Sequence, residues 1–262
     1  MLLILIIAIF AIGLAVGLLG NISGIGGGVM IVLVLVYGYG FKPIDAAGLS
    51  LLTIVFSTLV GFVQDIRKGL VDRKLLLVIA PIGVVASILG TEITNYVSTI
   101  TFKGVFAIIL ISLGLFSLYS SRRQRKYNLQ KKESSTAHTS DTGLVAIVSG
   151  AVSGFVGIGI GGIMGTYLTA IKKIDAKTAI ATVVAATLPI TIMGASLHFY
   201  ISGSISLTFA PPLIVGAVLG GLAGTSIIVK APHISLRFIQ GYVIIFFGSL
   251  SVLLFILSLY VH

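Results

Sequence analysis

Long apolar runs dominate the chain, and most polar residues fall between them. Most runs have about 17–25 residues, the length that crosses a hydrocarbon core of about 30 Å. They are apolar on every face, whereas strands of a membrane barrel would alternate in polarity over about ten residues. The pattern therefore predicts an all-α polytopic membrane protein. We expect ten segments, at 2–20, 27–41, 45–63, 75–93, 103–119, 143–156, 161–171, 176–199, 208–229 and 238–260.

One long hydrophilic stretch interrupts this pattern. It is basic at first, then rich in Ser and Thr, and it has no apolar periodicity, which is typical of a flexible linker. The expected organisation is an N-terminal membrane repeat at 1–120, a basic linker at 121–142 and a C-terminal membrane repeat at 143–262.

Composition excludes several classes of protein. Hydrophobic residues make up 57% of the chain and charged residues 9%, with a mean hydropathy of +1.17, which a water-soluble fold could not accommodate. Cysteine is absent, so disulfides and thiolate chemistry are excluded. The net charge of +10 does not point to nucleic acid, because the cations lie in loops and no soluble domain is long enough to present them.

The cations also predict an orientation, because short cytoplasmic loops collect Lys and Arg. Six of the 17 lie in the linker. If the linker is cytoplasmic and all ten segments cross, nine others face the same side: Arg67, Lys68, Arg73, Lys74, Lys172, Lys173, Lys177, Lys230 and Arg237. We therefore expect a multi-pass protein of the plasma membrane with a cytoplasmic linker and both termini extracytoplasmic.

The two halves resemble each other. "GNISGIGGGVMI" in the first half matches "SGFVGIGIGGIMG" in the second, and a "DA" pair follows each, at Asp45 and Asp175. Five crossings per repeat force the two repeats into opposite orientations. This is the inverted-repeat plan of many secondary transporters, in which substrate binds near the bilayer midplane.

Glycine is too dense in both motifs for a regular helix, since each costs about 1 kcal/mol relative to Ala. We expect broken backbone there, in short segments at matching positions of both halves, which points to a transporter site. Close packing of helices also enriches glycine in membranes and is an alternative explanation. A duplicated helix bundle with no transport role is a further alternative.

A helix that restarts after such a break presents free N–H groups and a positive dipole end, which attract an anion without any Lys or Arg. Backbone amides and nearby hydroxyl or amide groups would then hold the substrate. The expected substrate-binding residues are Asn21, Ser23, Gly24, Gly26, Gly27, Gly28, Ser153, Gly157, Gly159, Gly161 and Gly162.

Several polar residues are candidates for gating or for lining the pathway. Asp45 and Asp175 begin equivalent helices, where a carboxylate can cap N–H groups or take part in gating or proton coupling. Further along these helices, hydroxyls could line the path or bond back to their own helix; they belong to Thr53, Ser57, Thr182 and Thr187. His198 and Tyr200 are expected at the outer face as headgroup anchors, with proton coupling through His198 as the alternative.

Four stretches resemble one known family. "GIGGGVMIVLVL", "DAAGLSLLTIVFSTLVGFVQ", "GIGIGGIMGTYLT" and "DAKTAIATVV" are similar to the TauE/SafE family of sulfite and organosulfonate exporters, and the likeness covers nearly the whole chain. The resemblance implies export of a sulfur-containing oxyanion, driven by the proton gradient or the membrane potential. Family members are usually given about eight spans, so the two glycine-flanked segments could be re-entrant.

An enzyme is not expected. The chain has no HExxH, GxSxG or Walker motif, its four His are scattered, and neither a cofactor nor a metal is implied. We expect a secondary transporter that exports sulfite or an organosulfonate by alternating access. A passive anion channel, a permease for another small anion and a membrane scaffold are the alternatives. The expected partners are the small anion, the lipid bilayer and protons as coupling ion, and a homodimer is compatible with the sequence.

Overall fold

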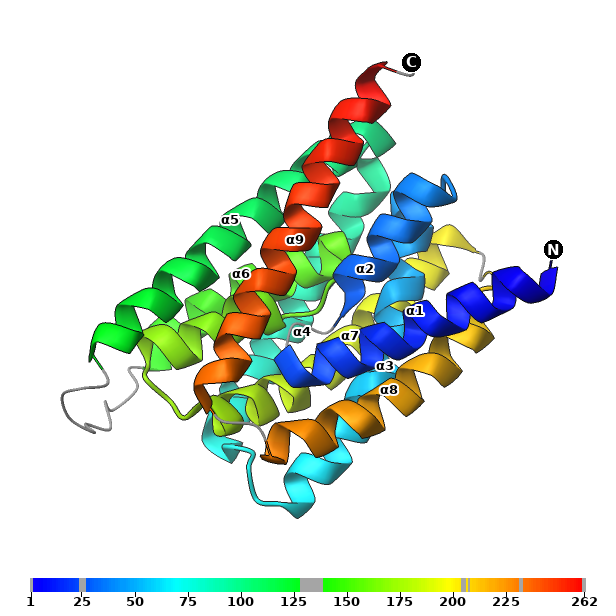
Figure 1. Ribbon diagram of the computed structural model, residues 1–262. Coiled ribbons are helices and arrows are strands. Elements are labelled where there is room, and N and C mark those ends of the chain that lie inside the picture. The colour runs from blue at the N-terminus through cyan, green and yellow to red at the C-terminus, as the bar shows by residue number, and fades with distance from the viewer. Residues whose placement is uncertain are drawn as a thin grey trace.

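The computed structural model describes residues 2–23, 27–127, 139–203, 206, 208–230 and 233–260. Within these residues the chain forms helices and no strand (Figure 1). The elements are α1 (Leu2–Ser23), α2 (Gly28–Leu33), the π-helix η1 (Val34–Gly38), α3 (Pro43–Arg67), α4 (Arg73–Tyr96), α5 (Thr99–Tyr127), α6 (Thr139–Val156), the π-helices η2 (Gly161–Gly165) and η3 (Tyr167–Ile171), α7 (Ala176–Ser202), α8 (Ala210–Lys230) and α9 (His233–Tyr260).

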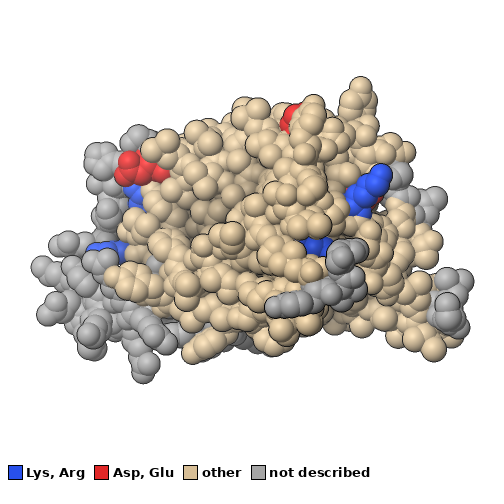
Figure 2. Space-filling view, turned by 90° about the horizontal axis from the view of Figure 1, so that it is seen from above, with Lys and Arg blue, Asp and Glu red and all other residues tan. Residues whose placement is uncertain are grey.

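The described helices suit a membrane. Six of them are long and apolar enough to cross it, and three shorter apolar helices accompany them. Figure 2 shows one face on which described charged residues are few and lie mainly toward the margins. Large apolar side chains are exposed on the surface, Leu77 at 74% and Ile4 at 72% among them. The prediction of an all-α polytopic membrane protein is confirmed, and a helix or helix pair lies at each of the ten expected segments.

Helices from one half pack against helices of the other. Helix α1 runs parallel to α8, with Gly13 against Leu213 and Gly17 against Ala217. A Cβ on Gly17 would lie 2.1 Å from the Ala217 carbonyl oxygen, so the absent side chain is what lets the two backbones touch. Glycine therefore serves close packing here, as the alternative explanation for its abundance proposed.

The pair that the repeat relates to α1 and α8 consists of α4 of the first half and α6 of the second, which also run parallel (Figure 1). Gly150 contacts the backbone of Gly83, and Gly154 contacts the backbone of Ser87. In each half, therefore, one helix packs against the first helix of the other half.

The equivalent helices of the two halves run in opposite directions. In the pair α3 and α7, Gly48 lies beside His198 and Gly61 beside Val184. In the pair α5 and α9, Gly104 lies beside Phe255 and Gly241 beside Leu118. Antiparallel equivalent helices are what an inverted repeat requires. The division of the chain at 121–142 stays a prediction; α5 and α6 extend into this range from both sides, and 128–138 lie outside the described residues.

The basic loops gather at one end of the molecule. The backbone N–H of Asp72, in the loop before α4, donates to Thr182 in the first turns of α7 at 2.9 Å. This contact brings the loop with Lys68 and Arg73 next to the loop with Lys172 and Lys173. At the other end, the Ser202 hydroxyl at the end of α7 donates to Asp45 at the start of α3.

The short segment Gly28–Gly38 leads the chain back toward the end of the molecule at which α1 begins. Phe209, just before α8, packs against Tyr39 and Phe41, with ring centroids 5.0 and 5.2 Å away, so α8 and α3 begin at the same end. Helix α1 begins there too, because it runs parallel to α8. The segment between α1 and α3 must therefore lead back to that end. At about 1.5 Å per residue its helical part covers only about half the bilayer core.

Candidate anion site

The two glycine breaks meet inside the bundle. A Cβ on Gly28 would lie 2.3 Å from the carbonyl oxygen of Gly157, so the two backbones are in direct contact. The chain turns sharply at Gly27, Gly157 and Gly159, whose φ angles are 73°, 81° and 78°. Side chains rarely tolerate these left-handed angles, which explains glycine at these positions. The expected breaks in the two helices are therefore present.

A serine joins the two breaks. Ser50 of α3 is fully buried, and its hydroxyl lies 2.6 Å from the Gly157 carbonyl and 3.3 Å from the Gly28 carbonyl. The two carbonyls that accept from this hydroxyl belong to different halves of the chain. Ser50 is not among the residues predicted from the sequence, because α3 carries several hydroxyls and periodicity does not tell which of them faces the break.

A short helical segment starts at each break. Gly28 begins α2, which continues into η1, and Gly161 begins η2, which is followed by η3. The first N–H groups of a helix have no acceptor within it and carry the positive end of its dipole. Helices of the π type are rare and occur often at functional sites. The arrangement can attract a small anion without a charged side chain.

Two buried polar side chains flank the breaks. Asn21 of α1 is 2% exposed and donates from Nδ2 to the carbonyls of Ser57 and Gly221, at 3.2 Å each, while its Oδ1 has no partner. Ser153 of α6 is fully buried and its hydroxyl has no partner. Both have hydrogen-bonding capacity to spare. Gly24 and Gly26 lie outside the described residues, as does the side chain of Ser23.

The second break faces α5 and α9 at its far side. A Cβ on Gly162 would meet only Leu113 and Ile244, each at 3.7 Å. At the first break an apolar pocket adjoins Gly27, lined also by Val16, Leu19, Val29, Met30, Val243, Ile244 and Phe247. The meeting point is therefore enclosed by apolar side chains on the side of α5 and α9.

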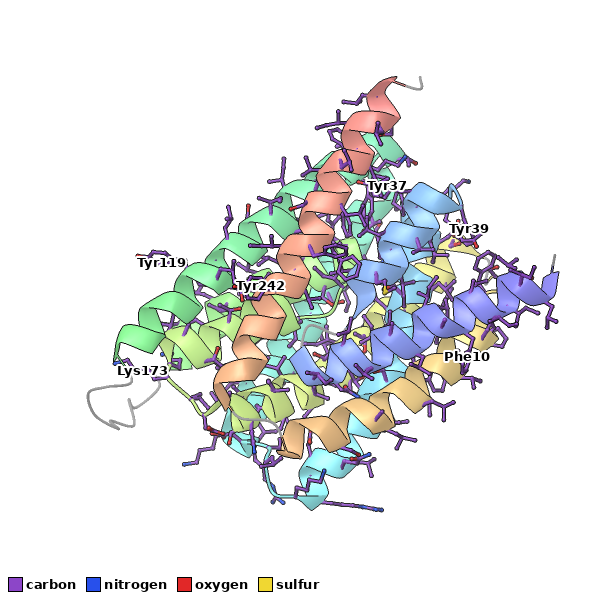
Figure 3. All side chains as sticks on the ribbon, in the orientation of Figure 1. Phe10, Tyr37, Tyr39, Tyr119, Lys173 and Tyr242 are labelled. Atoms are coloured by element: carbon purple, nitrogen blue, oxygen red, sulfur yellow. The ribbon has the colours of Figure 1, made fainter. Side chains whose placement is uncertain are left out.

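A lysine contacts a tyrosine ring of each short segment. The Lys103 ammonium lies 4.9 Å from the centre of the Tyr37 ring, and the Lys172 ammonium lies 5.6 Å from the centre of the Tyr167 ring. Figure 3 shows Tyr37 toward one end of the molecule and Lys173, which follows Lys172, at the other. A positively charged side chain thus lies against each of the two short segments.

The four candidate pathway hydroxyls do not come together. Thr53 donates to Leu49 of its own helix and Thr187 to Val183, so these two bond back as the alternative proposed. Thr182 accepts from Asp72 at the end with the basic loops. Ser57 alone of the four adjoins Asn21, through its carbonyl.

The two equivalent aspartates differ. Asp175 is the N-cap of α7 and accepts from the backbone N–H groups of Lys177 and Thr178, at 3.1 and 3.4 Å. Asp45 does not cap α3, because that helix already begins at Pro43. Its carboxylate accepts from the Ser202 hydroxyl instead.

The expectation that His198 anchors at the outer surface is wrong. His198 is fully buried, and its Nε2 lies 2.8 Å from the carbonyl oxygen of Gly154, near the end of α6. The side of α7 that carries His198 is covered by α3 and α6, so nearness to a helix end did not mean exposure. Tyr200, two residues on, is 85% exposed.

Two threonines of α4, also missed, complete the caps at the end of α6. Thr91 donates to the Gly154 carbonyl at 3.4 Å, and Thr94 donates to the Phe155 carbonyl at 2.8 Å. The last four carbonyls of a helix lack donor partners within it, so these hydroxyls satisfy two of them. A polar residue once per turn on the face of α4 toward α6 was the available signal.

This fold, with two interrupted helices meeting inside an inverted repeat, is that of a membrane transporter. A family model described as "Sulfite exporter TauE/SafE" matches residues 9–251, so the chain belongs to this family. It is 27% identical over 262 residues to the probable membrane transporter protein YunE of Bacillus subtilis, covering 92% of this chain and 95% of that protein.

A second relative is a probable membrane transporter protein of Methanocaldococcus jannaschii, 26% identical over 249 residues, covering 88% of this chain and 90% of that protein. No solved structure matches the chain. The names of the family and of these relatives indicate a transporter and not an enzyme.

Proposed function

We propose that the protein is a secondary transporter that exports a small sulfur-containing oxyanion, sulfite or an organosulfonate, across the plasma membrane by alternating access. The anion binds where Gly27 and Gly28 meet residues 157–162. The observation that carries the proposal is the direct contact of the two breaks, with Gly28 against Gly157 and Ser50 between them.

The chemistry of this meeting point suits a transported anion. Backbone N–H groups at helix starts and the Ser153 hydroxyl are neutral, so they bind an oxyanion without holding it as a fixed cation would. The description of the family supports sulfite as the first substrate to test.

The exchanged helices define the bodies that move. One bundle contains α1, α2, α3 and α8, and the other contains α6, η2, α7 and α4. Each has one helix from the other half of the sequence. Alternating access on this fold rocks these two mixed bundles against each other across α3 and α7, and opens or closes the Ser50 bridge. The basic loops face the cytoplasm and both termini lie outside.

Flux of radiolabelled sulfite into proteoliposomes tests the proposal, with sulfoacetate, sulfate and chloride as competitors. A carrier gives saturable flux that unlabelled sulfite on the opposite side accelerates, whereas a passive channel gives no such acceleration. Absence of flux for all four anions, from protein that elutes as a single folded species, would rule out the proposed substrate class.

Gly28→Ala tests the place of the site. The new Cβ overlaps the Gly157 carbonyl and the Ser50 hydroxyl, so we expect at least about a tenfold loss of sulfite flux, the equivalent of about 1.4 kcal/mol, within the range of overpacking costs. Gly38→Ala on the same short segment is the matched control, because nothing lies within 4 Å of its Cβ. Equal flux in both variants would place the site elsewhere.

A further inference from the structure

The imidazole of His198 is surrounded by hydrogen-bond acceptors. Its Nε2 lies 2.8 Å from the Gly154 carbonyl oxygen, and the ring also interacts with the Ile44 carbonyl and the Asp45 carboxylate. Its Nδ1 is buried and has no hydrogen-bond partner.

The neutral ring cannot satisfy both of its nitrogens in this environment. A carbonyl oxygen only accepts, so in the neutral ring the single hydrogen must sit on Nε2, and the Nδ1 lone pair is left buried without a donor. Buried polar atoms without partners are rare and call for an explanation. A proton on Nδ1 turns that nitrogen into a hydrogen-bond donor, and the groups around the ring are acceptors.

The charges around the ring are few. Among the described residues, Asp45 of α3 is the ionisable group that faces it, while α4 contributes Thr91 and α6 contributes the Gly154 backbone. Lys42 and Glu92, on the same neighbouring segments, are exposed at the surface. Asp45 is itself held by the Ser202 hydroxyl, one turn beyond His198.

The same groups connect the ring to the anion site. Gly154 lies three residues before Gly157, at the end of the helix that leads into the second break, and the Ser50 that holds Gly157 follows Asp45 on α3. A proton gained or lost at His198 changes the hold on the Gly154 carbonyl and on the start of α3 together.

We propose that His198 is the binding site for the coupling proton, with Asp45 as its counter-charge. The proposal rests on the proposed transport function and assigns the ion that drives it. Protonation of Nδ1 adds a tie from His198 to the start of α3 and strengthens the tie to α6, and loss of this proton releases α3 for the rearrangement of the breaks.

The test compares sulfite flux in proteoliposomes with and without an imposed pH gradient, at zero membrane potential, after subtraction of flux into liposomes without protein. His198→Gln keeps an amide donor for Gly154 but takes up no proton in this pH range. We expect downhill sulfite flux to persist in this variant and its acceleration by the gradient to disappear. Tyr200→Phe, an exposed position on the same helix, is the control and should respond like the wild type.

Asp45→Asn serves as a second variant if His198→Gln does not fold, and we expect it to weaken the response to the gradient. A full response in His198→Gln, or in Asp45→Asn where His198→Gln fails to fold, would overturn the proposal. So would wild-type flux that ignores the gradient, although that result leaves the permease function intact.

A readout without substrate separates the two proposals. In the full-length protein labelled with ¹⁵N-histidine, the His198 signal is the one absent from His198→Gln. We expect it to titrate reversibly while the protein stays folded. If no anion is transported but the ring titrates, the proposed substrate fails and the proton site stands; a ring that stays neutral throughout overturns the proton site whatever the flux.

Discussion

The two glycine breaks share a backbone plan but differ in their polar support. Four side chains from three helices donate to carbonyls of the second break, namely Ser50, Thr91, Thr94 and His198. At the described part of the first break, Ser50 lies 3.3 Å from Gly28, and an apolar pocket adjoins Gly27. Within the described residues, the two halves thus share the break itself but not the side chains that hold it. Substitutions at the second break should therefore cost more than those at the first.

The largest effect is expected for Gly157→Ala. A side chain here meets both a left-handed φ of 81° and the Ala47 Cα at 2.6 Å. Together these should lower stability by about 2–5 kcal/mol, measured by thermal unfolding in detergent. Gly203→Ala isolates the backbone contribution, because its φ is 67° but nothing lies within 4 Å, and it should cost about 1–2 kcal/mol. Equal losses would mean that the contact with Ala47 is not tight.

An intermediate effect is expected for Ser50→Ala, which removes the one hydroxyl shared by both breaks. The buried Gly157 carbonyl loses its partner, so stability should fall by about 1–3 kcal/mol, and sulfite flux should change with it. Thr58→Val, on the same helix, deletes a hydroxyl that bonds only to carbonyls of its own helix, Ile54 and Val55, and is the control. If the two variants unfold at the same temperature, Ser50 does not hold the breaks together.

The smallest effect is expected for Thr94→Val, which uncaps the Phe155 carbonyl at the second break alone. The loss should be about 0.5–1.5 kcal/mol in thermal unfolding, with sulfite flux retained. A loss of flux without a loss of stability would show that Thr94 acts in transport and not only as a cap.

Much of the architecture could be predicted from the sequence. Run length gave the ten segments, because crossing a bilayer fixes how many apolar residues a helix needs. Glycine density located both breaks, because side chains exclude left-handed backbone at positions such as Gly27 and Gly157.

The polar contacts could not be predicted in the same way. Ser50 looks like its neighbours Thr53 and Ser57 until α3 is packed against both breaks. His198 lies near a helix end, where exposure is the usual outcome, yet α3 and α6 cover it. Asp45 and Asp175 occupy matching sequence positions, but Pro43 starts α3 early and leaves Asp45 inside the first turn. Each of these facts depends on which helices become neighbours.

The pairing of α1 with α8 has a consequence for biogenesis. Gly13 meets Leu213, so α1 leaves the ribosome about 200 residues before the helix it packs against. At roughly 5–20 residues per second this takes about 10–40 s. During that interval α1 lies in the membrane without α8, and its mean hydropathy of 2.9, with no charged residue along its length, suits it to contact lipid there. Translation speed and insertion are thereby part of how this protein reaches its fold.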